Sequence, residues 1–249
     1  MIAYRDEGRG EPLILIHGIT EDHRVWQEFM PELTRSARVI RVDLPGHGES
    51  TAPPEFNAAA LTTPIAELCQ KLALDRPRAI GHSLGGVVAT LLAALVPVRS
   101  VLNVDQSLRL GPFIERVREL APKLDSPHFC AELNAEMERL GGPNLPERAR
   151  RELRAYRTEA RRPAVLGLWL PLTTQTEQAV LEPLAPLLRQ IRAPYLSLFG
   201  DDPGPDYESW LRQFIPQAQV ETWPGLGHWL HRVEPERFLA RVREFHATT

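Results

Sequence analysis

A serine stands between two glycines in residues 81–85, which read Gly-His-Ser-Leu-Gly. A short predicted strand, residues 78–81, precedes it, and an apolar run of helical length, residues 84–95, follows it. Small flanking residues permit a sharp strand-to-helix turn that strains the serine backbone and projects its hydroxyl above the sheet at the positive end of a helix. The pattern therefore predicts Ser83 as a nucleophile; a glycine-rich turn with an incidental serine is the alternative.

A histidine lies in a second glycine-rich loop, residues 224–231, Pro-Gly-Leu-Gly-His-Trp-Leu-His. A serine hydroxyl is a weak nucleophile at neutral pH and needs an imidazole base beside it. His228 follows the last predicted strand, so we expect it at the carboxyl edge of the sheet, where ligands bind in α/β proteins. His231 stands three residues away, but the pattern offers no third ligand, so we predict no metal site and expect His231 at the surface or behind the site.

Residues 17–19, His-Gly-Ile, follow another predicted strand. A small loop at this point lets the Ile19 N–H point toward the same spot as the Leu84 N–H. Two such donors stabilise the oxyanion of an acyl-transfer intermediate, each by about 3–4 kcal/mol in the transition state. We therefore predict Ile19 and Leu84 as an oxyanion hole, and a structural role in the turn for the His17 side chain.

Together with residues 43–50, Asp-Leu-Pro-Gly-His-Gly-Glu-Ser, these three patterns resemble the α/β-hydrolase superfamily, in particular its lidded serine esterase-like branch. The resemblance runs over nearly the whole chain and implies the order serine, acid, histidine along it. Only one predicted strand, residues 2–5, precedes the strand at 13–16. The usual first strand of the family is therefore missing, and we expect seven strands instead of eight.

The acid that orients the imidazole has two candidates. In most relatives it stands three residues after a glycine that follows the penultimate strand; here that position is Pro203, and Asp202 is one residue short. Other members place the acid directly after the strand that here ends near residue 104, which gives Asp105. Either carboxylate could hold the His228 ring in the correct tautomer. We favour Asp105 because of the displaced proline and keep Asp202 as the alternative, with capping of a helix near residue 207 as its other role.

Aliphatic runs alternate with longer helical patterns along the chain, which is typical of an α/β fold with a mostly parallel sheet and helices on both faces. The expected strands are residues 2–5, 13–16, 39–42, 78–81, 101–104, 195–199 and 220–222. The expected helices of the core are about residues 26–34, 58–73, 84–95, 207–214 and 235–246.

About 90 residues separate the strands ending near 104 and starting near 195, far more than a helical crossover needs. This stretch has helical patterns near residues 126–140, 146–161 and 175–190, the first with Ser126 as N-cap and Pro127 in the first turn. We therefore divide the chain into a hydrolase core, residues 1–106 and 191–249, and an inserted helical lid, residues 107–190. Leu168 and Trp169 are the expected substrate contacts, with packing of the lid on the core as the alternative.

Residues 145–162 contain seven Arg and three Glu, a local excess of +4. The pairs Glu147–Arg151 and Arg148–Glu152 have helix spacing, which favours a solvated helix face. Attraction of an anionic substrate or of an acyl-carrier partner is the alternative.

The composition sets limits on partners and location. The 249 residues include 29 Lys and Arg against 32 Asp and Glu, a net charge of −3, which disfavours non-specific nucleic-acid binding. Two cysteines in no metal-like spacing fit a reducing cytoplasm. The first ten residues lack the pattern of a signal peptide, and the longest apolar run, residues 85–98, is too short to span a bilayer. We expect a cytoplasmic protein with no membrane partner.

The residues and the resemblance together lead us to expect a cofactor-free serine hydrolase that cleaves a small-molecule carboxylic ester of small or medium acyl chain through an acyl-enzyme. Relatives that open epoxides or remove halides use an aspartate at the elbow, so Ser83 argues against both activities. A thioesterase, a lactonase, a carbon–carbon bond hydrolase, a synthase-like lyase and a perhydrolase remain alternatives on the same scaffold, because fold alone does not assign the leaving group. From another class, a ligand receptor with little turnover is the remaining alternative.

Overall fold

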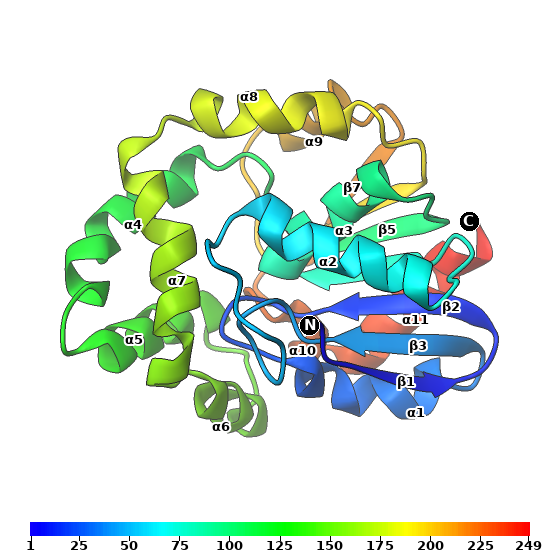
Figure 1. The fold of residues 1–249 in the computed structure, drawn as a ribbon, viewed down its shortest axis with the longest axis horizontal. Helices are drawn as coiled ribbons and strands as arrows, with labels where there is room; N and C mark the ends of the chain where they lie inside the picture. The colour runs from blue at the N-terminus through cyan, green and yellow to red at the C-terminus, as the bar shows by residue number, and fades with distance from the viewer.

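A seven-stranded sheet in the order β1-β3-β2-β4-β5-β6-β7 forms the centre of the molecule (Figure 1). The computed structural model describes residues 1–249 except the side chain of residue 159. Among the strand pairs that the structure describes, β1 and β3 are antiparallel and all the others are parallel. The strands are β1 (Tyr4–Gly8), β2 (Glu11–Ile16), β3 (Ala37–Val42), β4 (Arg78–His82), β5 (Ser100–Val104), β6 (Tyr195–Phe199) and β7 (Ala218–Thr222). The α/β fold class with seven strands is confirmed.

The first strand is displaced from the predicted residues 2–5, and the reason is its place at the sheet edge. β1 is held by the ladder to β3 and by ion pairs, such as Asp6 with Arg38 at 2.7 Å, and its residues 6–8 are exposed. An edge strand of this kind carries no apolar alternation that would mark its ends. The prediction was therefore wrong at this boundary.

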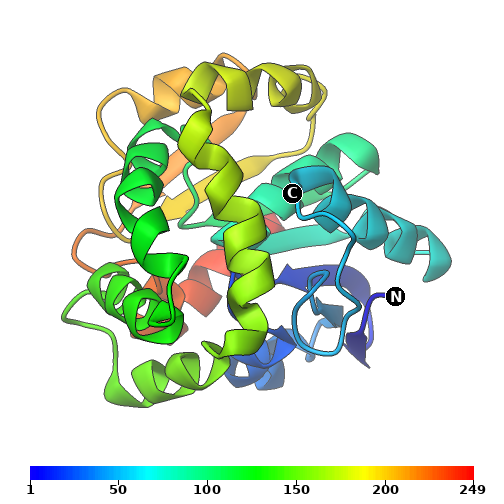
Figure 2. The same ribbon diagram turned by 60° about the vertical axis from the view of Figure 1, so that its left-hand side comes forward.

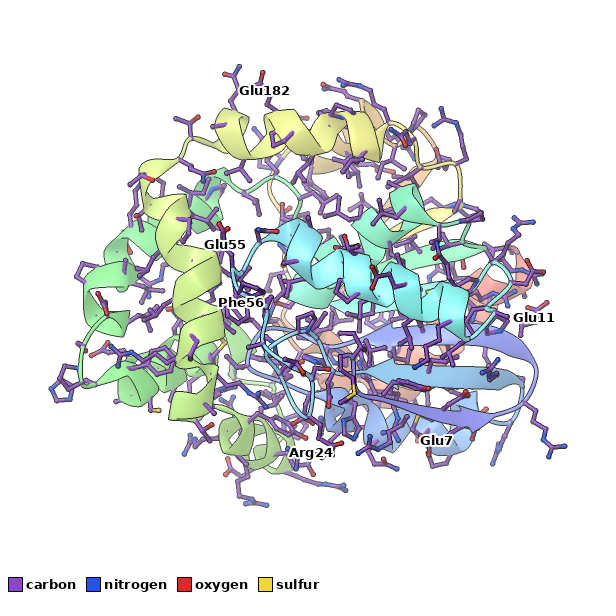
Figure 3. The ribbon with its side chains drawn as sticks, in the orientation of Figure 1. Glu7, Glu11, Arg24, Glu55, Phe56 and Glu182 are labelled. Atoms are coloured by element: carbon purple, nitrogen blue, oxygen red, sulfur yellow. The ribbon has the colours of Figure 1, made fainter. Side chains whose placement is uncertain are left out.

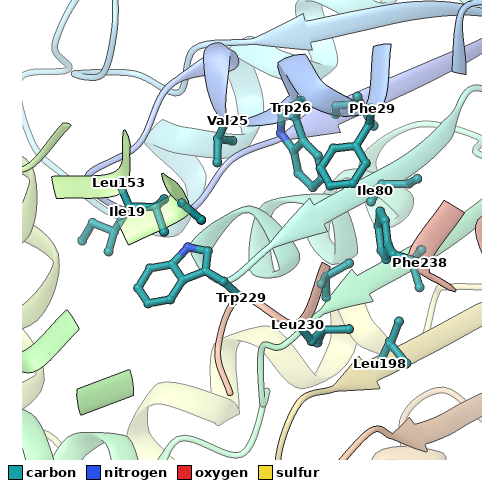
Figure 4. Packing of buried hydrophobic residues seen from close by; sticks show 14 of the residues in the cluster. Ile19, Val25, Trp26, Phe29, Ile80, Leu153, Leu198, Trp229, Leu230 and Phe238 are labelled. Atoms are coloured by element: carbon teal, nitrogen blue, oxygen red, sulfur yellow. The ribbon is translucent and has the colours of Figure 1, made fainter. Parts of the chain in front are cut away.

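Helices cover both faces of the sheet because alternate strand residues point to opposite sides. Leu13 and Leu15 of β2 join one apolar cluster, and Ile14 and Ile16 join the other. The first cluster includes Trp26, Phe29 and Phe238, whose rings pack together in Figure 4. The core helices are η1 (His23–Phe29), α1 (Met30–Leu33), α2 (Ala58–Lys71), α3 (Leu84–Leu95), α9 (Tyr207–Arg212), α10 (Leu230–Val233) and α11 (Pro235–Ala247). The predicted helix at 26–34 is thus a 3₁₀ turn that starts earlier, capped by the Asp22 side chain, and then a short α-helix.

The helical insert, residues 107–190, stands between β5 and β6 and lies beyond the carboxyl ends of the parallel strands (Figures 1 and 2). Its helices are α4 (Gly111–Leu124), α5 (Phe129–Gly141), α6 (Glu147–Tyr156), η2 (Glu159–Arg161), α7 (Arg162–Trp169), η3 (Leu170–Thr174) and α8 (Glu177–Leu188). The predicted pattern at 175–190 corresponds to α8, whereas α4 and α7 were not predicted. Ser126 is not the N-cap: its Oγ accepts from the His128 N–H, and α5 begins at Phe129.

The arginines of residues 145–162 face carboxylates. Arg148 lies 2.8 Å from Glu152, and Arg151 lies 3.6 Å from Glu147, at the predicted helix spacing. Arg154 lies 2.8 Å from Glu138 on the neighbouring helix α5. These pairs agree with a solvated helix face more than with a bare cationic patch.

None of the helices in the described part of the chain combines the length and the apolar character that crossing a membrane requires.

Candidate active site

Ser83 occupies the turn between β4 and α3 with a strained backbone, φ +53° and ψ −125°. The turn is so tight that a Cβ on Gly81 would lie 1.9 Å from the Gly85 carbonyl oxygen, which only glycine avoids. The Ser83 N–H donates to the Val104 carbonyl at 2.9 Å, which ties the turn to the end of β5. The side chain is therefore presented at the carboxyl edge of the sheet by a backbone conformation that few residues other than glycine adopt.

His228 and Asp105 are brought together from 123 positions apart in the chain. The His228 Nδ1 lies 2.6 Å from Asp105 Oδ2, and the other oxygen, Oδ1, accepts from the Gly200 N–H at 2.7 Å. Asp105 itself has φ +52° and donates its N–H to the Leu198 carbonyl at 2.8 Å. Because a carboxylate only accepts, the Nδ1–H of His228 donates to it, and Nε2 is left to take up a proton.

Asp202, the alternative acid, has different partners. Its Oδ1 accepts from the Gly204 N–H at 2.9 Å, and the residue is exposed at the cavity wall. It does not cap α9, whose N-cap residue is Asp206. The carboxylate hydrogen-bonded to His228 is thus that of Asp105, the favoured candidate.

The two predicted oxyanion donors, Ile19 and Leu84, border the same cavity as Ser83. Leu84 is the first residue of α3, so its N–H has no acceptor within the helix. Gly18, which precedes Ile19, packs so closely that a Cβ on it would lie 3.1 Å from the Ser83 Cβ. Gly18 therefore lies directly against the serine.

A buried pair behind the serine, Glu21 and His82, was missed in the sequence. Glu21 Oε2 accepts from the Gly18 N–H at 2.8 Å and lies 3.4 Å from His82 Nδ1, and its Oε1 accepts from the Trp229 indole at 2.7 Å. Burial alone would raise the pKa of Glu21, but the nearby His82 and the donated bonds outweigh it and lower the pKa. Burial would likewise lower the pKa of His82, but the Glu21 carboxylate outweighs it and raises the pKa. The only signals in the sequence were a charged residue four positions after His17 and a histidine directly before Ser83.

A cavity of about 630 Å³ connects the predicted residues. Its wall contains Ser83, Asp105, His228, Ile19, Leu84, Leu168, Trp169 and Asp202. Most of the remaining wall is apolar, from the segment 56–61, from α3 and from the insert. Phe56 lies beside α7 (Figure 3), close enough that a Cβ on Gly167 would meet its ring at 2.9 Å.

The insert also touches the loop that carries His228. The His228 N–H donates to the Leu140 carbonyl at 3.0 Å, and the Asn144 side chain donates to the Gly225 carbonyl at 2.7 Å. Gly227, with φ +65°, faces the end of α5, where a Cβ would lie 2.8 Å from the Gly141 oxygen. The end of α5 is therefore part of the support of His228.

Three further residues of the patterns noted in the sequence, His17, His231 and Asp43, are buried. His17 is buried, and its Nε2 accepts from the Leu44 N–H at 2.9 Å, as a structural role in the turn requires. His231 is fully buried against Trp26 and His82, so of its two expected places it lies behind the site and not at the surface. Asp43, which begins the segment 43–50, accepts from the backbone N–H groups of residues 23 and 49 and faces the His23 ring.

The chain is similar to known hydrolases in sequence and in structure. The model of the alpha/beta hydrolase family matches residues 13–241. A 2-(acetamidomethylene)succinate hydrolase of Mesorhizobium japonicum is 29% identical over 97% of this chain and 90% of its own. A pimeloyl-[acyl-carrier protein] methyl ester esterase of Photobacterium profundum is 36% identical over 53% of this chain and 43% of its own. A malate-bound esterase from Thermogutta terrifontis superposes with a TM-score of 0.78 and 25% identity, over 99% of this chain and 93% of that chain.

Proposed function

The chain belongs to the alpha/beta hydrolase family, and on that premise we propose that it is a serine hydrolase that cleaves carboxylic esters through an acyl-enzyme intermediate and needs no cofactor. The observation that carries this proposal is the hydrogen bond between Asp105 and His228. Both residues line the same cavity as Ser83, whose backbone is strained. A carboxylate, an imidazole and a hydroxyl at one sheet edge are the parts that acyl transfer needs.

The steps follow from the roles of these side chains. His228 Nε2 takes the Ser83 proton while Oγ attacks the carbonyl carbon of the ester, and the backbone N–H groups of Ile19 and Leu84 bind the oxyanion. Collapse of the tetrahedral intermediate breaks the ester bond, and the leaving alcohol takes the proton from His228. Water, deprotonated by the same imidazole, then attacks the acyl carbon, and Ser83 regains its proton as the acid leaves. Asp105 keeps Nδ1–H in place and stabilises the imidazolium.

The substrate is a small-molecule ester with an acyl chain of small or medium length. The volume of about 630 Å³ and the apolar wall support this class, with Leu168 and Trp169 as contacts of the chain. In this proposal residues 1–106 and 191–249 perform the chemistry, and residues 107–190 act as the lid that selects the substrate.

Arg109 makes esters that carry a carboxylate a second candidate. It is the only lysine or arginine in the described part of the cavity wall. A guanidinium binds carboxylates well, and two of the compared proteins are named for a succinate derivative or hold malate. Cleavage of a thioester, of a lactone or of a carbon–carbon bond stays an alternative reaction for the same site. An acyl-carrier protein stays an alternative partner.

Replacement of Ser83 by alanine tests the proposal. We expect Ser83→Ala to abolish turnover of p-nitrophenyl butyrate and labelling by a fluorophosphonate while circular dichroism and the melting midpoint stay at wild-type values. Full activity in the folded variant would remove the mechanism. A wild-type protein that neither labels nor turns over any ester, thioester or lactone of graded chain length would favour the receptor alternative.

A further inference from the structure

Glu21 and its buried partners lie outside the chemistry described above, yet they touch all three loops that supply it. The residue lies on the loop after β2, is 1% exposed and borders the cavity. Each of its carboxylate oxygens has a donor from a different loop. A buried carboxylate needs such partners, because an unpaired charge in the interior is costly.

The first connection is to the loop with the oxyanion donor. Glu21 Oε2 accepts from the Gly18 N–H at 2.8 Å, and the Glu21 N–H donates to the Gly18 carbonyl at 3.2 Å. The carboxylate thus holds the 17–18 peptide, and the Gly18 carbonyl of the next peptide is held by the Glu21 N–H and by His17 Nδ1 at 2.8 Å, so the oxyanion loop keeps one orientation. The Ile19 N–H is then the group of this turn that remains for the oxyanion.

The second connection runs through Trp229 to the base. Glu21 Oε1 accepts from the indole N–H of Trp229 at 2.7 Å, and this ring lies edge-on to the His228 ring with centroids 5.0 Å apart. Trp229 packs in the same apolar cluster as Ile19 (Figure 4). On the side of the insert, the Arg157 guanidinium lies 5.4 Å from the Trp229 ring, which adds positive charge near the carboxylate.

The third connection runs through the residue that precedes the nucleophile. His82 Nδ1 faces Glu21 Oε2 at 3.4 Å, and its Nε2–H donates to the His228 carbonyl at 2.9 Å. His82 is fully buried, and its ring lies 4.7 Å from the His228 ring. One imidazole thus joins the loop of the serine to the loop of the base.

We propose that Glu21 is a positioning residue of the acyl-transfer site, which holds the oxyanion loop, the serine turn and the histidine loop in one register. The proposal rests on the serine hydrolase function proposed above. It assigns Glu21 no proton transfer and no contact with the reacting atoms.

Glu21→Gln breaks this arrangement without changing the volume. In the wild-type protein both carboxylate oxygens of Glu21 accept hydrogen bonds. An amide offers one acceptor oxygen and one NH₂ group, so in the variant either the Gly18 N–H or the Trp229 indole N–H loses its acceptor. We expect kcat on p-nitrophenyl butyrate to fall about 10²-fold with KM within about threefold, because misplacement of an oxyanion donor affects the transition state and not the ground state. Glu221→Gln is the matched control, since Glu221 also accepts an indole N–H, from Trp223 at 2.6 Å, away from the cavity. It should keep wild-type kcat and KM.

A tetrahedral analogue separates positioning from general damage. The affinity for butylboronic acid, which forms a tetrahedral adduct with the serine, should fall by the same factor as kcat, whereas the affinity for the product butyrate should stay constant. Wild-type kcat and boronate affinity in folded Glu21→Gln, or an equal loss in Glu221→Gln, would overturn the inference. If Glu21→Gln does not fold, Trp229→Phe provides the test, because it removes the indole N–H that Glu21 accepts. Loss of both kcat and boronate affinity in this variant supports the inference, and wild-type values overturn it. Activity that survives Ser83→Ala would instead refute the proposed function.

Discussion

Asp105 and Leu168 border the same cavity, one from the carboxyl edge of the sheet and one from the insert, and they are held in different ways. Asp105 is fixed by three hydrogen bonds of 2.6–2.8 Å, through its N–H and both carboxylate oxygens. Leu168 is half-buried and packs against the two apolar clusters. Hydrogen bonds are directional and fix the position of an atom to a few tenths of an ångström. Apolar packing tolerates replacement of one side chain by another of similar volume.

The difference separates two tasks. In the proposed mechanism the sheet edge presents the reacting groups, whose geometry admits little change, and the insert provides a cavity wall whose side chains can vary. Substitutions at the edge should therefore act on kcat, and substitutions in the wall should act on KM and on the choice of substrate. The following three variants test this division, in decreasing order of expected effect.

Asp105→Asn is expected to have the largest effect. The amide keeps the size of the side chain but does not hold the Nδ1–H tautomer of His228, so kcat should fall on the order of 10⁴-fold. Steady-state kinetics on p-nitrophenyl butyrate measure it, with Asp202→Asn as the comparison, which should change kcat only slightly. Equal, mild losses in both variants would show that neither carboxylate is the triad acid.

Gly227→Ala tests the place where the two regions meet. The added Cβ would lie 2.8 Å from the Gly141 oxygen and 3.0 Å from that of Leu140, which accepts the His228 N–H. Displacement of the imidazole by about 1 Å should lower kcat about 10²-fold. Gly204→Ala is the control, because Gly204 also has positive φ but its Cβ would meet open space. A similar loss in both would point to backbone strain and not to the contact with α5.

Leu168→Ala should have the smallest effect, and it should depend on the substrate. The shortened side chain removes apolar contact with the acyl chain, so KM for p-nitrophenyl hexanoate should rise about tenfold while that for the acetate stays near wild type. Leu166→Ala, on the same helix but outside the described cavity wall, should change neither value. A fall in kcat for all chain lengths would contradict the division of tasks.

The sequence predicted the parts of the site that are marked by local chemistry. Gly81 and Gly85 around Ser83 announce a tight turn, and the predicted order of strands brings residues 105 and 228 to the same edge. The local sequence favoured Asp105 over Asp202 only through Pro203, which occupies the usual position of the acid. Both candidates follow parallel strands, and the hydrogen bond that distinguishes them joins residues 123 positions apart. Glu21 was missed because its three partners, Gly18, His82 and Trp229, come from three segments far apart in the chain.

The insert was predicted less completely than the core. Its α4 has apolar residues at helical spacing, Ile114, Val117 and Leu124, but no side-chain cap marks its start. The helix α7 spans eight residues, too few for a periodic pattern to stand out. Both helices pack against η3 and against each other, and such tertiary packing contributes more to their stability than local propensity does.

The bond from the His228 N–H to the end of α5 limits how this scaffold can be re-engineered. A chimaera that exchanges α7 through α8 for the corresponding segment of a related enzyme would leave the imidazole's loop untouched and could acquire a new substrate range. A graft that also replaces residues 140–144 would remove a backbone acceptor on which that loop depends, and it would have to supply a carbonyl at the same point. A recombination boundary at residue 162, where α7 begins, is therefore the safer choice for directed evolution, because Arg157 of the preceding segment lies against Trp229.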